Sequence, residues 1–136
     1  MQQKTNPPAA DIPMGAEGVP VDETERLIAS DKVEGTPVYN LQGESIGSIY
    51  NLMIDKRSGQ VCYAVMSFGG FLGIGERYHP LPWKMLRYEP RQGGYVVDLT
   101  REQLEGAPSY GRDEAPWGDP EYGRSVYGYY RIPFYI

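Results

Sequence analysis

The chain has few of the residues that carry most enzyme and metal chemistry. Its 136 residues include one cysteine, Cys62, and one histidine, His79. A lone cysteine excludes an intramolecular disulfide, and a lone histidine excludes a histidine-rich metal site. Because Cys62 lies between apolar neighbours in a β-type segment, we expect it to be buried rather than reactive. These shortages predict a protein that is not an enzyme, with no catalytic residues, no metal and no cofactor.

Long apolar runs are also missing. No stretch of the sequence approaches the roughly 18 apolar residues that a membrane-spanning helix needs. The first residues lack the apolar core of a signal peptide. The net charge of −5 disfavours binding to nucleic acid or to an anionic membrane surface. We therefore expect a cytoplasmic protein that does not insert directly into a membrane.

Basic residues do gather in one part of the sequence, close to aromatic residues. This cluster consists of Arg77, Lys84, Arg87 and Arg91. Glu76 and Glu89 lie among its members and reduce the local charge, so a solvated charged surface is the favoured interpretation. Small barrels do bind oligonucleotides through such faces, but here nucleic acid is not the expected partner.

Glycines divide residues 36–86 into short β-type segments, as is typical of a small, closed antiparallel β-structure. The two longest segments, residues 45–55 and 60–68, flank a four-residue hairpin loop. Both faces of these segments are partly apolar, which predicts barrel strands that another part of the chain covers. Gly47 is expected to mark a bend or a close backbone approach in a tightly curved sheet. Asp55, at the entrance to the loop, is expected to accept hydrogen bonds from turn amides rather than act as an acid.

A glycine-rich loop follows the second long segment. Residues 69–75 contain four glycines but lack the Gly-Lys-Ser/Thr ending of a phosphate-binding loop, and no helix start follows. We interpret this loop as a turn in a curved sheet. Its apolar side chains are candidates for a protein contact, with at least one of them exposed; they are Phe71, Leu72 and Ile74. Trp83 follows Pro82, and it either packs at a corner of the barrel or offers an exposed aromatic contact.

Composition divides the chain into three parts. Residues 1–25 are rich in proline and predict a flexible arm. Residues 26–106 form the β domain, which ends in a short helix capped by Thr100. Residues 107–136 contain six of the twelve tyrosines and predict an extended aromatic tail that docks on its own barrel or on a neighbour. The candidate contact residues of this tail are Trp117, Tyr129, Tyr130, Phe134 and Tyr135.

Several segments together resemble the PRC-barrel domain over about residues 26–105. The residues that carry the resemblance lie in 43–49, 54–65, 69–76 and 81–83. This domain is shared by the cytoplasmic part of the photosynthetic reaction-centre H subunit and by the C-terminal domain of a bacterial ribosome maturation factor. The tail looks like that of stand-alone bacterial members. The resemblance implies a six-stranded antiparallel β-barrel that serves as a docking module and often self-associates.

The expected function is therefore non-enzymatic protein–protein interaction. The expected partners are a second copy of the chain, as a homodimer or higher oligomer, and an unidentified protein. Two alternatives remain open at this point. The chain could be an RNA-associated barrel that acts in ribosome or RNA processing, or a subunit of a photosynthetic or other membrane-associated complex.

Overall fold

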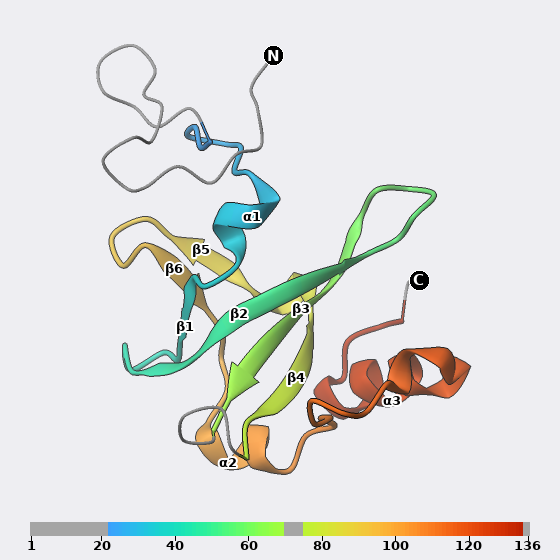
Figure 1. Cartoon of the computed structure of the whole chain (residues 1–136). Helices are drawn as coiled ribbons and strands as arrows, with labels where there is room; N and C mark the ends of the chain where they lie inside the picture. The colour runs from blue at the N-terminus through green and yellow to red at the C-terminus, as the bar shows by residue number, and fades with distance from the viewer. Residues whose placement is uncertain (1–21, 70–74, 135–136) are drawn as a thin grey trace. The chain divides into compact units, whose positions relative to one another are not determined.

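Six strands form one sheet in the computed structural model of the chain (Figure 1), which describes residues 22–69 and 75–134. The chain divides into two units, residues 1–32 and 33–136, and the short helix α1 (Ser30–Val33) crosses the boundary in sequence. The strands of the second unit are β1 (Pro37–Tyr39), β2 (Ser45–Ile54), β3 (Val61–Phe68), β4 (Arg77–Pro82), β5 (Arg87–Glu89) and β6 (Gly94–Val96). Its helices are η3 (Trp83–Met85), α2 (Arg101–Glu105), η4 (Pro116–Gly118) and α3 (Pro120–Tyr130).

The described part of the first unit is organised around Lys32. Its ammonium group lies 3.1 Å from the carboxylate of Glu23 and 3.5 Å from that of Asp22. The hydrogen bond to Glu23 is the main reason that the pKa of Lys32 is raised above its ordinary value. The hydroxyl of Thr24 accepts a hydrogen bond from the backbone N–H of Leu27 at 2.9 Å, which fixes the turn between them.

The sheet is mixed and open, so the expectation of a closed, all-antiparallel barrel is wrong in these two details. The strand order is β4-β3-β2-β1-β6-β5, and β1 pairs with β6 in parallel while the other neighbours are antiparallel. Closure would require β4 to pair with β5. The backbone N–H and carbonyl of Tyr78 point to the edge of β4 that faces away from β3, where they bond to Tyr110. The backbone nitrogens of Pro80 and Pro82 point to the same edge, and proline has no N–H to donate there.

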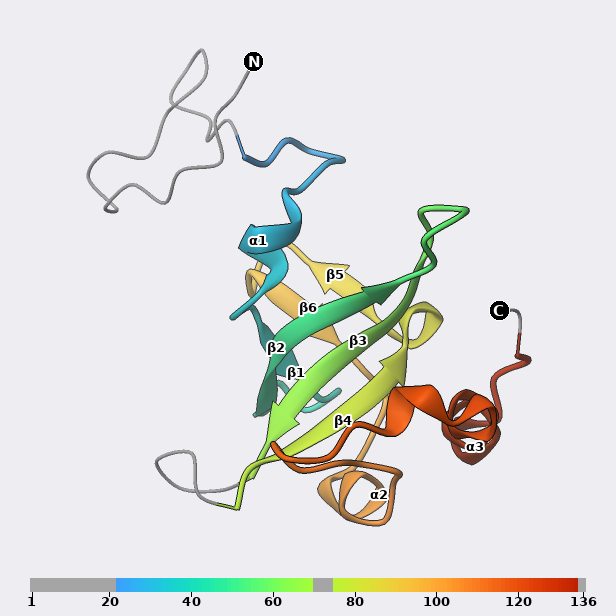
Figure 2. The same cartoon turned by 45° about the vertical axis from the view of Figure 1, so that its right-hand side comes forward.

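The sheet nevertheless curls over itself to enclose a core. Figure 2 shows β2, β3 and β4 crossing in front of β1, β5 and β6. Side chains from both halves are almost completely buried, and each contributes about 1.5–3 kcal/mol through burial. The main members of this inner core are Val38, Ile49, Met66, Leu81, Val97 and Leu104.

The long hairpin forms as the sequence predicts. One oxygen of Asp55 accepts hydrogen bonds from the backbone N–H of Arg57 at 2.8 Å and of Ser58 at 3.4 Å. Gly47 lies so close to the next strand that a Cβ atom there would overlap the carbonyl oxygen of Ser67. Of the two roles expected for Gly47, a bend or a close backbone approach, the structure shows the close approach.

Helix α2 also follows its sequence signal. The hydroxyl of Thr100 accepts a hydrogen bond from the backbone N–H of Gln103 at 3.1 Å, and the side-chain oxygen of Gln103 accepts one from the backbone N–H of Thr100 at 2.8 Å. This reciprocal arrangement satisfies two donors at the start of the helix.

The tail is not extended, because helix α3 occupies 11 of its residues. Asp119 caps the helix by accepting a hydrogen bond from the N–H of Glu121 at 2.9 Å, and Pro120 occupies the first turn. Arg131 ends it in the left-handed conformation, with φ of 59°. The expectation of extended segments missed this helix because one of the positions that face the sheet is Gly123, which interrupts the apolar periodicity.

The only histidine lies inside the sheet. His79 of β4 is 3% exposed, stands opposite Met66 of β3, and packs edge-to-face on Phe68 with ring centroids 5.4 Å apart. Its Nδ1 atom has no hydrogen-bond partner among the described residues. Burial, with a smaller effect of the nearby Arg77 charge, lowers the pKa of His79 from 6.5 to about 4.

Acid should therefore destabilise the protein through His79. The unfolded chain binds this proton below about pH 6.5 while the folded chain resists it until about pH 4. The free energy of unfolding should thus fall as the pH drops from 6.5 to 4, by up to about 3 kcal/mol from this residue. Urea unfolding of the wild type and of His79→Gln at several pH values measures this, because the carboxylates titrate alike in both. Parallel pH profiles for the two proteins would contradict the assignment.

Candidate interaction surface

The outer face of the sheet is largely apolar toward the end of β3 that begins at Val61, and it is uncharged along β2 and β3. The strand register places Met53 of β2, Tyr63 of β3 and Pro82 of β4 side by side on this outer face. Strands β2 and β3 contain no Lys, Arg, Asp or Glu at all. An apolar sheet face of this kind must be covered by something other than water.

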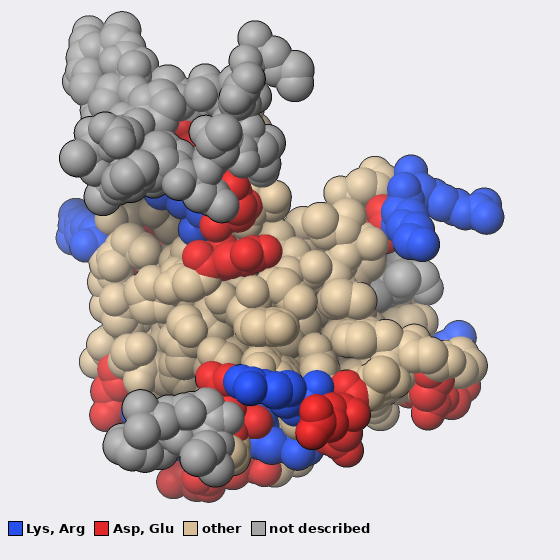
Figure 3. Space-filling view, viewed as in Figure 1, with Lys and Arg blue, Asp and Glu red and all other residues tan. Residues whose placement is uncertain are grey.

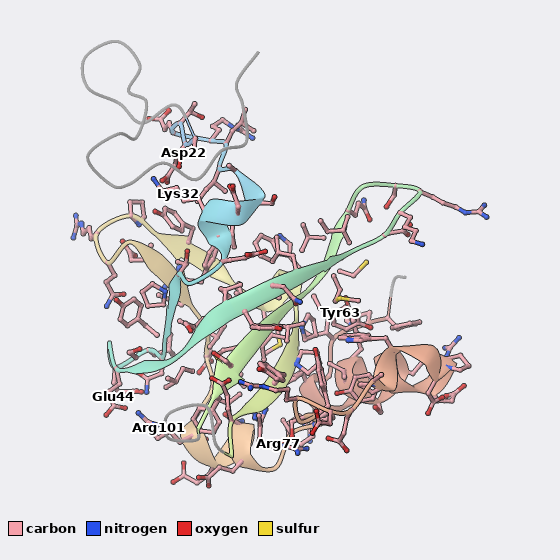
Figure 4. All side chains as sticks on the ribbon, in the orientation of Figure 1. Asp22, Lys32, Glu44, Tyr63, Arg77 and Arg101 are labelled. Carbon is pink, nitrogen blue, oxygen red and sulfur yellow. The ribbon has the colours of Figure 1, made fainter. Side chains whose placement is uncertain are left out.

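The tail covers much of this face. Tyr63 is the centre of the contact: its ring packs on Trp117 with centroids 5.0 Å apart and on Tyr127 at 5.4 Å. The hydroxyl of Tyr127 donates a hydrogen bond of 2.9 Å to the carbonyl oxygen of Cys62. Figure 4 shows the labelled Tyr63 beside the tail. The other members of this aromatic cluster are Met53, Tyr122, Val126, Tyr130, Ile132 and Phe134.

The same tail closes the outer edge of β4. The backbone of Tyr110 forms two hydrogen bonds with the backbone of Tyr78, of 2.8 and 3.0 Å. The guanidinium of Arg77 donates to the hydroxyl and the carbonyl of Ser109 and lies 3.4 Å from the carboxylate of Glu114. Arg77 is therefore held by the tail, and the carboxylate of Glu114 partly balances its charge.

The structure separates the predicted contact residues into groups. Trp117, Tyr130 and Phe134 are half-buried together in the aromatic cluster. Tyr129 is 40% exposed, and its hydroxyl donates to the carbonyl of Gln103 at 2.6 Å. Trp83 lies elsewhere, half-buried, and its ring packs on that of Tyr95 of β6. Four further predicted residues lie outside the described residues; they are Phe71, Leu72, Ile74 and Tyr135.

Two residues that the sequence did not single out are the most exposed apolar side chains of β2. Tyr50 is 51% exposed and Ile54 is 49% exposed, whereas Asn51 and Met53 between them are half-buried. Tyr50 packs on Tyr78, with ring centroids 4.5 Å apart, so it continues the outer face next to the tail. The apolar pattern on both faces of β2 predicted burial of the whole strand. No local pattern in the sequence indicates how much of the outer face of β2 the tail covers.

The side chains of Cys62, His79 and Tyr122, which carry ionisable groups, pack inside the structure. Cys62 is 5% exposed, as expected, and burial raises the pKa of its thiol. Cys62 and His79 lie on different strands and contact different groups, so they form no nucleophile–base pair. Burial also raises the pKa of the Tyr122 hydroxyl to about 12, so this hydroxyl is neutral at physiological pH. Within residues 22–69 and 75–134, no group of three or more His, Cys, Asp or Glu side chains is placed to hold a metal ion.

Comparison with known families agrees with this architecture. The sequence model of the PRC-barrel domain matches residues 25–104. The chain belongs to the PRC-barrel family. A search of curated proteins finds no match. The resemblance stated from the sequence is thereby confirmed, and the tail that covers the PRC-barrel domain lies beyond the matched residues.

The described part of the chain also bears on membrane association. It contains no helix with the length and apolar character needed to cross a bilayer.

The docking of α3 on this PRC-barrel domain depends on a glycine. A Cβ atom on Gly123 would overlap the hydroxyl of Tyr63 and lie 3.3 Å from the ring of Phe134. Tyr63 cannot move aside easily, because the rings of Trp117 and Tyr127 both pack on it. Gly128 of the same helix is the matched control, since a Cβ atom there would meet nothing within 4 Å.

Gly123→Ala should lower the free energy of unfolding by about 1–3 kcal/mol, because overpacking outweighs the gain in helix propensity. Gly128→Ala should raise it by about 0.5–1 kcal/mol through helix propensity alone. Chemical denaturation of the two variants provides the comparison. Equal stabilisation by both substitutions would mean that α3 does not lie against Tyr63.

Proposed function

We propose that this PRC-barrel protein is a non-enzymatic docking module that binds other protein molecules through the outer face of its sheet. The C-terminal tail covers the outer face of the sheet only in part, and this partial cover is the main support for the proposal. Tyr50 and Ile54 remain about half exposed beside the covered region. Exposed aromatic and aliphatic side chains held on a rigid strand are typical of protein contacts.

The charges around this face support the proposal. Figure 3 shows an uncharged surface along β2, with basic side chains projecting at one end. Lys56 and Arg57 are exposed in the hairpin turn that follows β2. Glu44 precedes β2, and Arg101 donates a hydrogen bond of 3.3 Å to the carbonyl of Ser45 nearby. An uncharged centre with a charged rim is the usual anatomy of a protein interface.

A non-enzymatic role also agrees with how the reactive side chains are used. Cys62 and His79 are buried in the sheet, and the carboxylate of Asp55 holds the hairpin turn. None of the three combines exposure with a partner group that would activate it. The domain therefore provides shape and apolar surface rather than chemistry.

The docking function predicts protein cross-links at the exposed part of the outer face. Intact protein carrying a photo-reactive amino acid at Ile54 should form specific cross-links in native lysate. Tyr50→Lys, introduced into the same protein, should reduce their yield about tenfold, since a cation would have to be buried. Leu41→Lys is the control, because Leu41 is 55% exposed but lies in a turn outside β2. Absence of any cross-linked protein, or an equal loss with both substitutions, would contradict the function.

A further inference from the structure

The edge of β2 that faces away from β3 is paired along only part of its length. Strand β1 pairs with residues 45–48 of β2. Just beyond, the N–H of Ile49 donates to the carbonyl of Thr36 at 2.9 Å, and its carbonyl accepts from the N–H of Gly35 at 2.7 Å. From Tyr50 to Ile54 no strand of the described chain lies on this side. We refer to residues 50–54 as the open edge.

The open edge lacks the features that protect the other two edges of the sheet. Strand β4 is closed by Tyr110 and by prolines that lack an N–H, and β5 is only three residues long with a charged residue at each end. The open edge contains no proline and no charged residue. Natural proteins rarely leave such an edge unblocked, because its backbone donors and acceptors pair readily with another strand.

Two irregularities limit how much pairing this edge can support. The register with β3 shifts between Ile49 and Asn51 and again between Met53 and Ile54. Bulges interrupt a regular ladder and increase the local twist. Only a short central segment around Leu52 can therefore form backbone hydrogen bonds, and the side chains of Tyr50 and Ile54 must supply the remaining contact. A pairing of this size is expected to be reversible.

We infer that the open edge pairs with the same edge of a second copy of the chain, antiparallel and about a two-fold axis near Leu52. This inference rests on the proposed docking function and names the partner of that surface. An antiparallel arrangement brings Tyr50 of each copy beside the partner's Ile54, and aromatic–aliphatic neighbours of this kind stabilise paired strands. A two-fold interface uses the same patch twice, so the patch must complement itself. An uncharged edge that is flanked symmetrically by one aromatic and one aliphatic side chain meets this requirement.

The charges at the two ends of the open edge favour a second copy in this orientation. At one end, β2 continues into the exposed Lys56 and Arg57. At the other end lies the segment that bonds to Ile49, and the exposed Glu34 immediately precedes it. Antiparallel pairing brings the two cations of each copy toward the partner's Glu34. Parallel pairing would instead place the cations of both copies together, which is unfavourable.

Sedimentation of the intact chain across micromolar and higher concentrations tests the dimer. The wild type should show a reversible monomer–dimer equilibrium. Tyr50→Lys and Ile54→Lys should each raise the dissociation constant at least about tenfold, because a cation would be buried at the pairing edge. Leu41→Lys makes the same chemical change at an exposed site outside the edge and should leave the equilibrium unchanged. Circular dichroism of each variant checks that its fold is retained.

A charge exchange tests the orientation. Glu34→Lys alone and the double variant Lys56→Glu with Arg57→Glu should each lose self-association, because like charges would meet at both ends of the edge. An equimolar mixture of the two variants should recover a dimer, since opposite charges then meet at both contacts. A mixture that stays monomeric would overturn the antiparallel arrangement.

A wild-type chain that is monomeric at every concentration would overturn the inference as a whole. If such a monomer still formed the lysate cross-links described above, the docking function would stand, with a foreign strand as the occupant of the edge. A dimer with no cross-links to other proteins would support the inference and restrict the docking function to self-association.

Discussion

The structure depends on the fact that β3 is apolar on both of its faces. Its inner face contributes Met66 to the core of the curled sheet, and its outer face presents Tyr63. The barrel domain alone has no layer to place over Tyr63, so the residues beyond the family match supply one. The tail is therefore part of the folded unit in physical terms, because without it a continuous apolar face would be left in water.

Covering β3 has consequences for the rest of the sheet. Tyr127 of the tail is fully buried and contributes on the order of 1.5–3 kcal/mol before the cost of ordering is subtracted, and the half-buried Trp117, Tyr122, Tyr130 and Phe134 add to it. This is large against a net domain stability of about 5–15 kcal/mol. The tail also pairs with β4 through Tyr110, so the sheet does not close at that edge. The tail leaves the side chains of Tyr50 and Ile54 exposed on β2, and the proposed docking surface is built on these two residues.

The parts of this structure that could be read from the sequence are those set by local chemistry. Asp55 at the hairpin turn, Gly47 at the close approach and the capping pair of Thr100 and Gln103 each act within a few residues or on one neighbouring strand. The parallel pairing of β1 with β6 could not be read in this way. Strand β1 is three residues long and carries no periodicity, and its partner lies more than fifty residues away.

The helix in the tail and the exposed surface of β2 were missed for related reasons. Gly123 faces the sheet in place of an apolar residue, because only a glycine lets α3 approach Tyr63 so closely. The apolar pattern of α3 is therefore interrupted at the position where the helix packs most closely on the sheet. Tyr50 and Tyr63 each lie within one of the two long β-type segments, yet one is exposed and the other buried. The difference arises from where a distant segment docks, which no local pattern encodes.

Hydrogen exchange of the intact chain tests most directly whether the tail and β3 form one cooperative unit. The amides of Val126, Tyr127 and Tyr130 in α3 should exchange at rates comparable to those of Tyr63 and Val65 in β3, because both elements should open together. Exchange of the α3 amides at the rates of a free peptide, while β3 remains protected, would contradict this prediction. The tail would then be an appendage of the PRC-barrel domain rather than the layer that completes it.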